Sequence, residues 1–240
     1  MKLFVMLYGV LSYLLFFLVF VCFIAFVGDF FVPQVIASES VMDASNALLI
    51  DLGLILLWGV QHTVMARGWF KEAIAGVIPK HVERSTYVLV SAVVLAFLMY
   101  FWQPMEGVLW QIESSTLQQM IWGLFAIGWL LVFVATFLTD HFDLFGLRQT
   151  WLYYVGKSYT SVKFTERLFY RSIRHPMMLG LLIAFWAVPR MTTDHLVFSA
   201  GMTVYIIIGI YFEERGLART IGAAYQEYQG RTSKIIPKIY

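Results

Sequence analysis

The sequence predicts an all-α fold, a polytopic bundle of six transmembrane helices with short interfacial helices on the cytoplasmic side. Two observations lead to this prediction. The 240 residues are 60% hydrophobic and only 13% charged, whereas soluble domains carry about 25% charged residues. The chain also contains several apolar runs long enough to cross a hydrocarbon layer of roughly 30 Å at about 1.5 Å per residue.

The first apolar run, residues 3–27, contains no charged residue. It is longer than the hydrophobic region of a cleaved signal, and no small-residue cleavage site follows it. We therefore expect a transmembrane helix that remains in the mature protein.

Five further runs complete the predicted bundle. Three of them have spanning length and are separated by polar loops that carry Pro or Gly: residues 47–65, 85–102 and 117–138. The last two, residues 177–188 and 196–212, lie so close together that they predict a tight helical hairpin, whose short first arm requires tilt or local thinning of the bilayer. We expect a four-helix transmembrane part, residues 1–138, and a cofactor-binding part, residues 139–240, with a cytoplasmic segment, the hairpin and a C-terminal helix.

Basic residues fall on one side of this topology. Cytoplasmic loops are enriched in Lys and Arg, and with a cytoplasmic N-terminus 16 of the 17 basic residues lie on that side, Arg190 being opposite. Both termini are therefore predicted to be cytoplasmic. Two long segments, residues 141–176 and 213–240, then face the cytosol, and we expect them to hold a polar ligand while an apolar one arrives through lipid. The alternative is that their aromatic and basic residues only anchor the chain at the interface.

Simple counts exclude several kinds of function. The net charge of +2 is too small to indicate a nucleic-acid partner, so the expected partner is the lipid bilayer, and no oligomeric state is indicated. Cys22 is the single cysteine, which excludes a disulfide or a thiolate cluster within the chain, and no metal site is expected. Since no Gly-x-Gly occurs among the 17 glycines, a Rossmann-type cofactor site is not supported.

Polar and glycine residues flank the predicted hairpin. They are Arg174, His175, Pro176 and Gly180 at its start, and Glu213, Glu214, Gly222, Tyr225, Tyr228 and Pro237 at and after its end. The pattern resembles that of the membrane methyltransferases that include isoprenylcysteine carboxyl methyltransferases and phospholipid N-methyltransferases. Met178 stands where that superfamily has Tyr, so no hydroxyl role is carried over to this position.

The resemblance extends over nearly the whole chain. Further stretches resemble the bacterial methanethiol S-methyltransferases: residues 26–33, 61–67, 82–87, 140–149, 184–187 and 189–192. Enzymes of that family transfer a methyl group from S-adenosylmethionine to methanethiol, giving dimethyl sulfide. The resemblance therefore implies a membrane transferase with S-adenosylmethionine as cofactor and a small thiol as substrate.

The start of the hairpin suits such a cofactor. Pro176 at the first turn of a helix leaves backbone N–H donors beside it, and a helix N-terminus favours an anion such as the cofactor carboxylate. His175 offers ring nitrogens, and Gly180 allows the backbone to approach a ligand closely. Tyr225 and Tyr228 are expected to stack on adenine or to face the sulfonium, with core packing as the alternative. An ordinary capped helix start is the alternative reading of the first motif.

Glu213 and Glu214 end an apolar run, where a helix C-terminus disfavours acids unless the helix continues. The helical spacing of the following apolar residues predicts that it does continue. We expect one carboxylate to accept hydrogen bonds from the cofactor ribose and the other to pair with a nearby Arg. Simple salt bridging to Arg215 or Arg219 is the alternative.

Methyl transfer from a sulfonium to sulfur requires in-line positioning, dry surroundings and a thiolate. Because a thiol is largely protonated near neutral pH, a base helps. We expect His141, flanked by Asp140 and Asp143, to be that base, and Arg148 to supply positive potential. The alternative is that these residues only mark the exit of the chain from the membrane.

His62, with Gln61, near the inner end of the second run, is a second candidate for the base. A small apolar pocket for the acceptor is expected to involve the same two residues and Trp186. Each of these residues has packing as an alternative role. No residue identifies the acceptor among small nucleophiles, and a lipid or prenyl acceptor stays open.

Two other kinds of function stay open from the sequence. Residues 225–240 are similar to the end of membrane sterol reductases that use NADPH, for which Arg215, Arg219 and Arg231 would hold a 2′-phosphate. A haem-carrying or transport protein would use His62 and His141 as ligands or pore residues. The lack of inverted repeats and the grouping of polar residues on one face count against transport.

Overall fold

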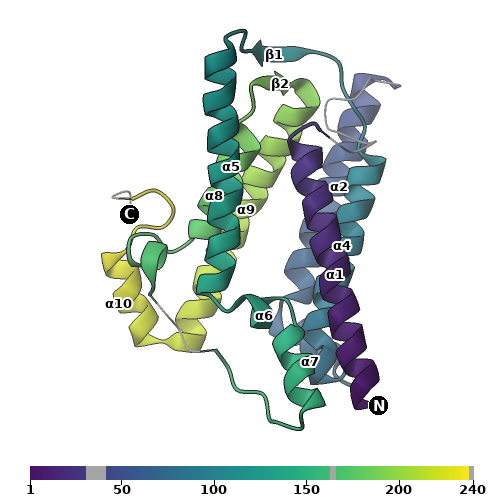
Figure 1. The fold of residues 1–240 in the computed structure, drawn as a ribbon, viewed down its shortest axis with the longest axis vertical. Coiled ribbons are helices and arrows are strands. Elements are labelled where there is room, and N and C mark those ends of the chain that lie inside the picture. The colour runs from purple at the N-terminus through teal and green to yellow at the C-terminus, as the bar shows by residue number, and fades with distance from the viewer. Residues whose placement is uncertain (31–41, 163–165, 238–240) are drawn as a thin grey trace. The chain divides into compact units, whose positions relative to one another are not determined.

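A computed structural model describes residues 1–30, 42–162 and 166–237 and divides the chain into two compact units (Figure 1). The first unit comprises Met1–Glu106 and Asp140–Val162, and the second comprises Gly107–Thr139 and Lys163–Tyr240. The all-α fold is confirmed, since the described residues form helices apart from one two-stranded sheet. Some of the predicted features lie outside the described part. They are residues 31–33 of one motif and two of the counted basic residues, Lys163 and Lys238.

The first unit is built on three long helices and three short ones. They are α1 (Lys2–Val27), α2 (Ala44–Met65), α3 (Gly68–Ile74), α4 (Lys80–Phe101), α6 (His141–Leu144) and α7 (Leu147–Tyr154). The helix α4 packs against both α1 and α2, and α7 packs on α1 and α4. Gly9 permits the approach of α7, because a Cβ at this position would lie 2.3 Å from Oγ1 of Thr150. The short helices therefore pack against one end of the long helices α1, α2 and α4.

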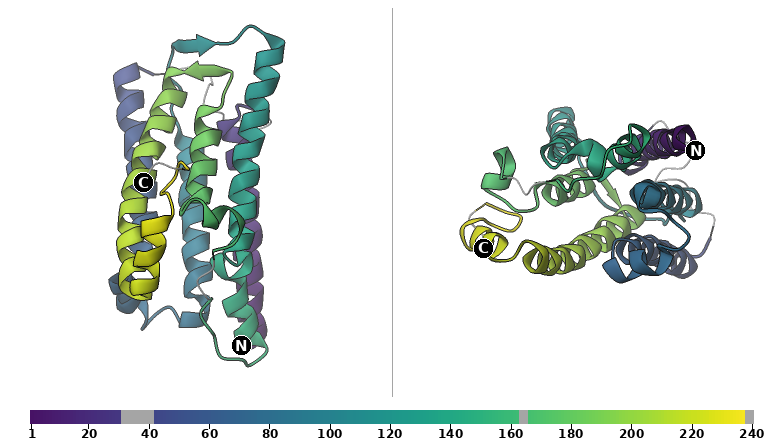
Figure 2. Two further views of the ribbon diagram at one scale, coloured as in Figure 1. Left: turned by 90° about the vertical axis from the view of Figure 1, so that its left-hand side faces the viewer. Right: turned by 90° about the horizontal axis from the view of Figure 1, so that it is seen from below.

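The second unit contains the predicted hairpin. Its elements are β1 (Val108–Gln111), α5 (Ser115–Leu138), the 3-10 helix η1 (Leu168–Arg171), α8 (Pro176–Trp186), β2 (Arg190–Thr192), α9 (Thr193–Ile221) and α10 (Ala223–Arg231). The strands pair antiparallel, with Val108 opposite Thr192 and Gln111 opposite Arg190. Figure 2 shows α5, α8 and α9 side by side below this small sheet. The prediction that α9 continues past Glu213 and Glu214 is confirmed.

The helices α5 and α8 are in close backbone contact. A Cβ on Gly128 would lie 2.7 Å from the carbonyl oxygen of Gly180, and a Cβ on Gly180 would lie 2.6 Å from the carbonyl oxygen of Gly128. Small residues at facing positions are typical of helix pairs in membranes, because they let the two backbones approach. The lack of a side chain at Gly180 therefore serves helix packing, and its role in cofactor binding stays a prediction.

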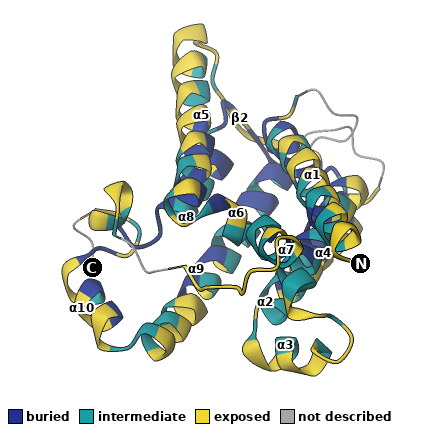
Figure 3. Cartoon of the chain, turned by 60° about the horizontal axis from the view of Figure 1, so that its bottom comes forward, coloured by how far each residue is buried: buried dark blue, intermediate teal, exposed yellow. Residues whose placement is uncertain are grey.

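In the part of the chain that the structure describes, five helices are long and apolar enough to cross a membrane: α1, α2, α4, α5 and α9. The predicted count of six is not confirmed, because α8 has 11 residues and spans only about 16 Å at 1.5 Å per residue. Large apolar side chains on these helices, such as Phe4 and Leu11 on α1, are exposed and available to lipid. Figure 3 shows exposed residues along α1 in yellow. The division of roles between residues 1–138 and 139–240 stays a prediction, and the compact units place α5 with α8 and α9.

The contact between α5 and α8 gives a stability prediction. The substitution Gly128→Ala places a methyl group 2.7 Å from Gly180 O and 2.8 Å from Ala184 N, backbone atoms that cannot rotate away. We expect it to destabilise the protein by about 1–3 kcal/mol, measured as a lower midpoint of thermal unfolding in detergent. Gly123→Ala on the same helix is the control, because its Cβ meets nothing within 4 Å. Equal midpoints for the two variants would contradict this packing.

Candidate functional site

The start of α8 is joined to the segment that follows α10. The backbone N–H of Arg174 donates to Ser233 O at 2.8 Å, and that of His175 donates to Lys234 O at 3.1 Å. Ile173 and Ser233 form a parallel bridge. Pro176 then begins α8, where its missing N–H costs nothing. The motif residues 174–176 are thus fixed by the C-terminal segment rather than by the helix alone.

Arg174 is the centre of this junction and is only 8% exposed. Its Nε donates to Oε1 of Glu214 at 2.6 Å, and its Nη1 donates to the carbonyl oxygens of Gln229, at 3.0 Å, and Thr232. The guanidinium therefore links α8, α9 and the end of α10. Because its charge is compensated by a buried carboxylate, Arg174 stabilises the architecture of this end of the unit.

The two glutamates of α9 have different environments. Glu214 has a side chain 12% exposed and pairs with Arg174, whereas the Glu213 side chain is 47% exposed. His175 lies between them, with Nε2 3.2 Å from Glu214 Oε1 and Nδ1 3.6 Å from Glu213 Oε2. Lys234, half-exposed, has Nζ 3.8 Å from Glu214 Oε2. One carboxylate is thus part of a buried ion-pair network and the other is available to a ligand.

The partner of Glu214 is Arg174, 40 residues away in sequence, and neither of the two arginines considered as the alternative. The guanidinium of Arg215 lies over the ring of Tyr211, 4.7 Å from its centroid. A long-range partner of this kind follows only from the tertiary structure.

Tyr225 and Tyr228 lie inside this end of the unit, each 1% exposed. The hydroxyl of Tyr228 donates to the carbonyl oxygen of Tyr170 at 2.6 Å, and the two tyrosine rings are 5.8 Å apart. Burial, aided by the nearby Glu166 carboxylate, raises the pKa of Tyr228 to about 12, so the phenol is neutral at physiological pH. The rings pack α10 onto η1, and stacking on adenine stays a prediction for both.

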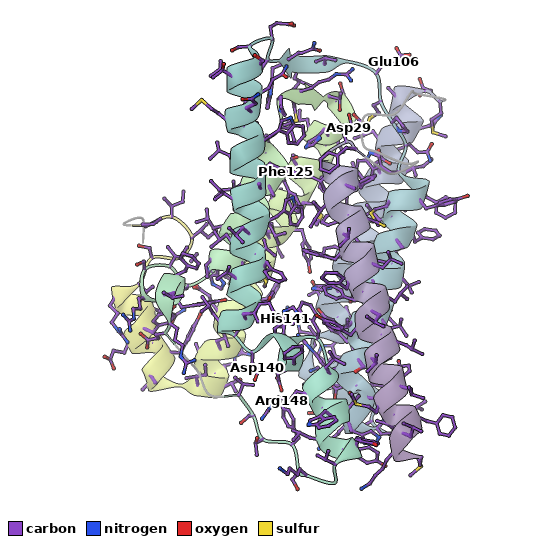
Figure 4. All side chains as sticks on the ribbon, viewed as in Figure 1. Asp29, Glu106, Phe125, Asp140, His141 and Arg148 are labelled. Carbon is purple, nitrogen blue, oxygen red and sulfur yellow. The ribbon has the colours of Figure 1, made fainter. Side chains whose placement is uncertain are left out.

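His141 belongs to the first unit and begins α6 (Figure 4). Its Nε2 and the hydroxyl of Tyr13, on α1, are joined by a hydrogen bond of 2.8 Å. The ring is 5% exposed and lies against the ring of Phe145 at 4.9 Å. Burial lowers the pKa of His141, with a smaller opposing effect from Asp140. The imidazole is therefore neutral near pH 7, which a general base requires.

The carboxylates beside His141 bind backbone and arginine groups. Asp140 has a left-handed backbone, φ 72°, and its Oδ1 accepts a hydrogen bond from the N–H of Asp143 at 3.1 Å. Asp143 accepts from Arg148 at 2.8 Å, and this hydrogen bond raises the pKa of Arg148. Arg148 also donates to the carbonyl oxygen of Thr160 at 2.7 Å and to its hydroxyl at 2.8 Å. The positive charge of Arg148 is therefore compensated locally, and the residue holds the segment after α7.

Gln61 and His62 lie at the contact of α2 with α4. His62 Nε2 is 2.8 Å from the hydroxyl of Tyr87, and His62 Nδ1 is 3.3 Å from Ser91 Oγ. Gln61 donates to the same Ser91 oxygen at 3.2 Å. Trp186, in the second unit, donates to Thr203 Oγ1 at 3.0 Å and is 38% exposed.

The structure groups the predicted residues into three clusters. The first unit holds a His141 cluster and a Gln61–His62 cluster, and the second holds an Arg174–Glu214 cluster. Sequence reasoning missed Tyr13, which lies in a featureless apolar run, and it missed Tyr87 and Ser91 as partners of His62, although their spacing of four puts them on one face of a helix. Within the described ranges, no group of three or more His, Cys, Asp or Glu side chains is placed to hold a metal ion.

The fold and these clusters define an integral membrane protein with a cluster of charged side chains at the start of the short helix α8. The sequence profile of the NnrU protein family matches residues 50–238. The chain is 43% identical to a methanethiol S-methyltransferase of Crocosphaera subtropica, over 98% of this chain and 92% of that protein. It is 42% identical to a methanethiol S-methyltransferase of Mycobacterium tuberculosis, over 96% and 94%.

The chain therefore belongs to the NnrU family, and its resemblance to the bacterial methanethiol S-methyltransferases is confirmed. A more distant relative is nurim of Xenopus laevis, 33% identical over 65% of this chain and 58% of that protein. No solved structure matches the chain.

The ion pair between Arg174 and Glu214 gives a prediction about stability that does not depend on ligand binding. The substitution Arg174→Gln leaves the Glu214 carboxylate without its closest cation. Because an uncompensated buried charge costs about 3–5 kcal/mol, we expect a clear fall in the thermal midpoint and faster proteolysis near the C-terminus. Arg215→Gln is the control, because that side chain only covers the exposed ring of Tyr211. Unchanged stability of Arg174→Gln would refute the assignment.

Proposed function

We propose that this protein transfers a methyl group from S-adenosylmethionine to methanethiol, forming dimethyl sulfide, at the cytoplasmic side of a bacterial inner membrane. One observation carries the proposal. In a chain related over almost its full length to methanethiol S-methyltransferases, an accessible carboxylate, Glu213, stands beside the buried Arg174–Glu214 pair at the start of α8. A methyl donor needs a polar site beside an apolar region, and the charged side chains of this cluster at the end of apolar helices support such a site.

The residues of this cluster fit the polar parts of S-adenosylmethionine. Glu213 is a half-exposed acceptor for ribose hydroxyls or for the ammonium group, and Lys234 is a half-exposed cation for the carboxylate. The N-terminus of α8 adds backbone N–H groups and a favourable dipole. Thr232 Oγ1 is buried and has no hydrogen-bond partner within residues 166–237, the described part of this end of the chain. Such an unsatisfied group favours a polar ligand at this place.

The role of each motif residue follows from these contacts. Glu213 and His175 are proposed to bind the cofactor, with Pro176 fixing the helix end that meets it. Arg174 and Glu214 hold the geometry. Tyr225 and Tyr228 form the inner wall of the site, and Gly180 brings α5 against α8.

The donor supplies an electrophilic methyl group on a sulfonium. In the transfer, the thiol sulfur forms a bond to the methyl carbon, the bond from that carbon to the sulfonium sulfur breaks, and S-adenosylhomocysteine leaves. The thiol proton is accepted by Nδ1 of the neutral His141 imidazole, in the tautomer whose Nε2–H donates to the hydroxyl oxygen of Tyr13 and so orients the ring. Asp140, Asp143 and Arg148 keep α6 and the following segment in place.

The proposed orientation follows the distribution of charge within the second unit. Arg190 lies in β2, before α9 begins, whereas Arg174 and Arg215 lie near the other end of that helix. Since basic residues are retained on the cytoplasmic side, the Arg174–Glu214 end is the cytoplasmic one.

The activity is tested directly with detergent-solubilised protein, methyl-labelled S-adenosylmethionine and methanethiol. Labelled dimethyl sulfide in the headspace is the expected product. Its absence, together with tight binding of NADPH and no binding of S-adenosylhomocysteine in calorimetric titrations, would overturn the proposal.

The role of Glu213 gives a second kinetic prediction. Removing a charged acceptor from a ligand costs about 1.5–3 kcal/mol, so Glu213→Gln is expected to raise the KM for S-adenosylmethionine about 10- to 100-fold and to change kcat much less. Glu227→Gln on α10 is the matched control, because its side chain is exposed. Equal KM values for the variant and the native protein would remove Glu213 from the site.

The role of His141 gives a pH prediction. Burial lowers the pKa of His141, so the imidazole stays unprotonated at pH values where an exposed histidine is already protonated. The rate should therefore fall only when the pH drops through this lowered pKa. We expect His141→Gln to reduce kcat about 100-fold or more and to abolish this acidic limb. His81→Gln, on α4, is the control. An acidic limb that persists in His141→Gln would assign the base to another residue.

A further inference from the structure

The contact between α2 and α4 contains polar groups that the proposed mechanism does not use. The ring of Trp58 stacks on the ring of His62 at 4.8 Å with an angle of 19°. His62 is hydrogen-bonded to Tyr87, and Ser91 joins His62 to Gln61. All five residues lie within two apolar membrane-spanning helices. Polar side chains in such segments are costly and mark functional sites.

Gln61 is the unusual member of this cluster. Its Nε2 donates to the thioether sulfur of Met65 at 3.1 Å as well as to Ser91 Oγ. Its Oε1 is buried and has no hydrogen-bond partner in the described parts of the chain. An unsatisfied buried acceptor costs about 1–3 kcal/mol. The Nε2 of Gln61 therefore donates to a sulfur atom, whereas its Oε1 lacks a donor.

The side chain of Met65 has the chemistry of a small dialkyl sulfide. Its sulfur carries a terminal methyl group and a methylene, and it accepts a hydrogen bond from Gln61. A thiol has a weak S–H donor and a weak acceptor on one sulfur atom. The S–H of a small thiol would satisfy Oε1, and its sulfur would accept from Nε2 in the place that Met65 sulfur now occupies. Methionine is unbranched and flexible, so it can move aside or line such a site.

We propose that Gln61 binds the sulfur of the acceptor thiol between α2 and α4, and that Met65 limits the size of the alkyl group on that sulfur. The inference rests on the proposed function for the identity of the acceptor. Trp58 and His62 form an aromatic wall, and Ser91 fixes the amide of Gln61. The site binds the thiol before transfer, and its aromatic and methionine side chains exclude water.

Acceptor size provides the first test. Met65→Ala removes the thioether and opens space for longer alkyl groups. Since one methylene in an apolar pocket changes specificity about 10- to 200-fold, the preference for methanethiol over ethanethiol in kcat/KM should fall about tenfold or more. Met120→Ala is the control, because this side chain is 64% exposed on α5. An unchanged preference in Met65→Ala would overturn the assignment of Met65.

Gln61→Met provides the second test, because it preserves length and removes the amide. We expect the KM for methanethiol to rise about tenfold or more, with the KM for S-adenosylmethionine unchanged. A parallel rise in both values, or in neither, would show that Gln61 does not bind the acceptor.

A binding measurement separates this inference from the proposed activity. Saturation-transfer NMR with methanethiol, without any methyl donor, should give a signal for the native protein in detergent that Gln61→Met largely abolishes. Gln118→Leu on α5 is the control for uptake by the micelle. If the protein forms no dimethyl sulfide yet binds methanethiol through Gln61, the proposed function fails and the sulfur site stands. If dimethyl sulfide forms and neither Gln61→Met nor Met65→Ala alters acceptor kinetics, the sulfur site fails alone.

Discussion

The ion pair between Arg174 and Glu214 determines the arrangement of the second unit. It joins residues 40 positions apart, and the same guanidinium binds two carbonyl oxygens from the end of α10. Charges buried in this way are tolerated only when hydrogen bonds complete their environment. The pair thereby fixes the start of α8, the end of α9 and the C-terminal segment relative to one another. Glu214 forms the ion pair with Arg174, and the neighbouring Glu213 keeps an accessible side chain.

The opposite end of the hairpin is stabilised by hydrogen bonds to a backbone carbonyl group. The carbonyl oxygen of Phe185, near the C-terminus of α8, accepts hydrogen bonds from Ser199 Oγ at 2.7 Å and lies 3.0 Å from His195 Nε2. A helix end without water needs such partners for its last carbonyl groups. Asp51 has a similar part in the first unit, where it accepts a hydrogen bond from the N–H of Gln103 beyond the end of α4. These polar residues within apolar helices therefore complete backbone hydrogen bonding.

The first unit shows a different use of polar groups. Tyr13 and His141, and Tyr87 and His62, are two tyrosine–histidine pairs, each joined at 2.8 Å and each linking different helices. A hydrogen bond to one ring nitrogen fixes the orientation of an imidazole and influences its tautomer. Both pairs lie among aromatic rings. This unit thus presents histidines oriented by tyrosine hydroxyl groups, whereas the second presents compensated charges.

The sequence by itself determined the membrane class, the helical fold and the family, because apolar runs, loop charges and motif residues are local or linear properties. It also predicted that one glutamate of α9 pairs with an arginine, and the structure identifies Arg174 as that arginine. Tertiary structure alone decided which glutamate is buried, that Gly180 meets Gly128, and that Tyr13 contacts His141. The sequence predicted six spans, whereas α8 is too short to be counted as one. A short helix can pack along α5 without crossing a bilayer. Contacts between distant residues depend on how helices pack, and helical periodicity in one segment does not encode its partner.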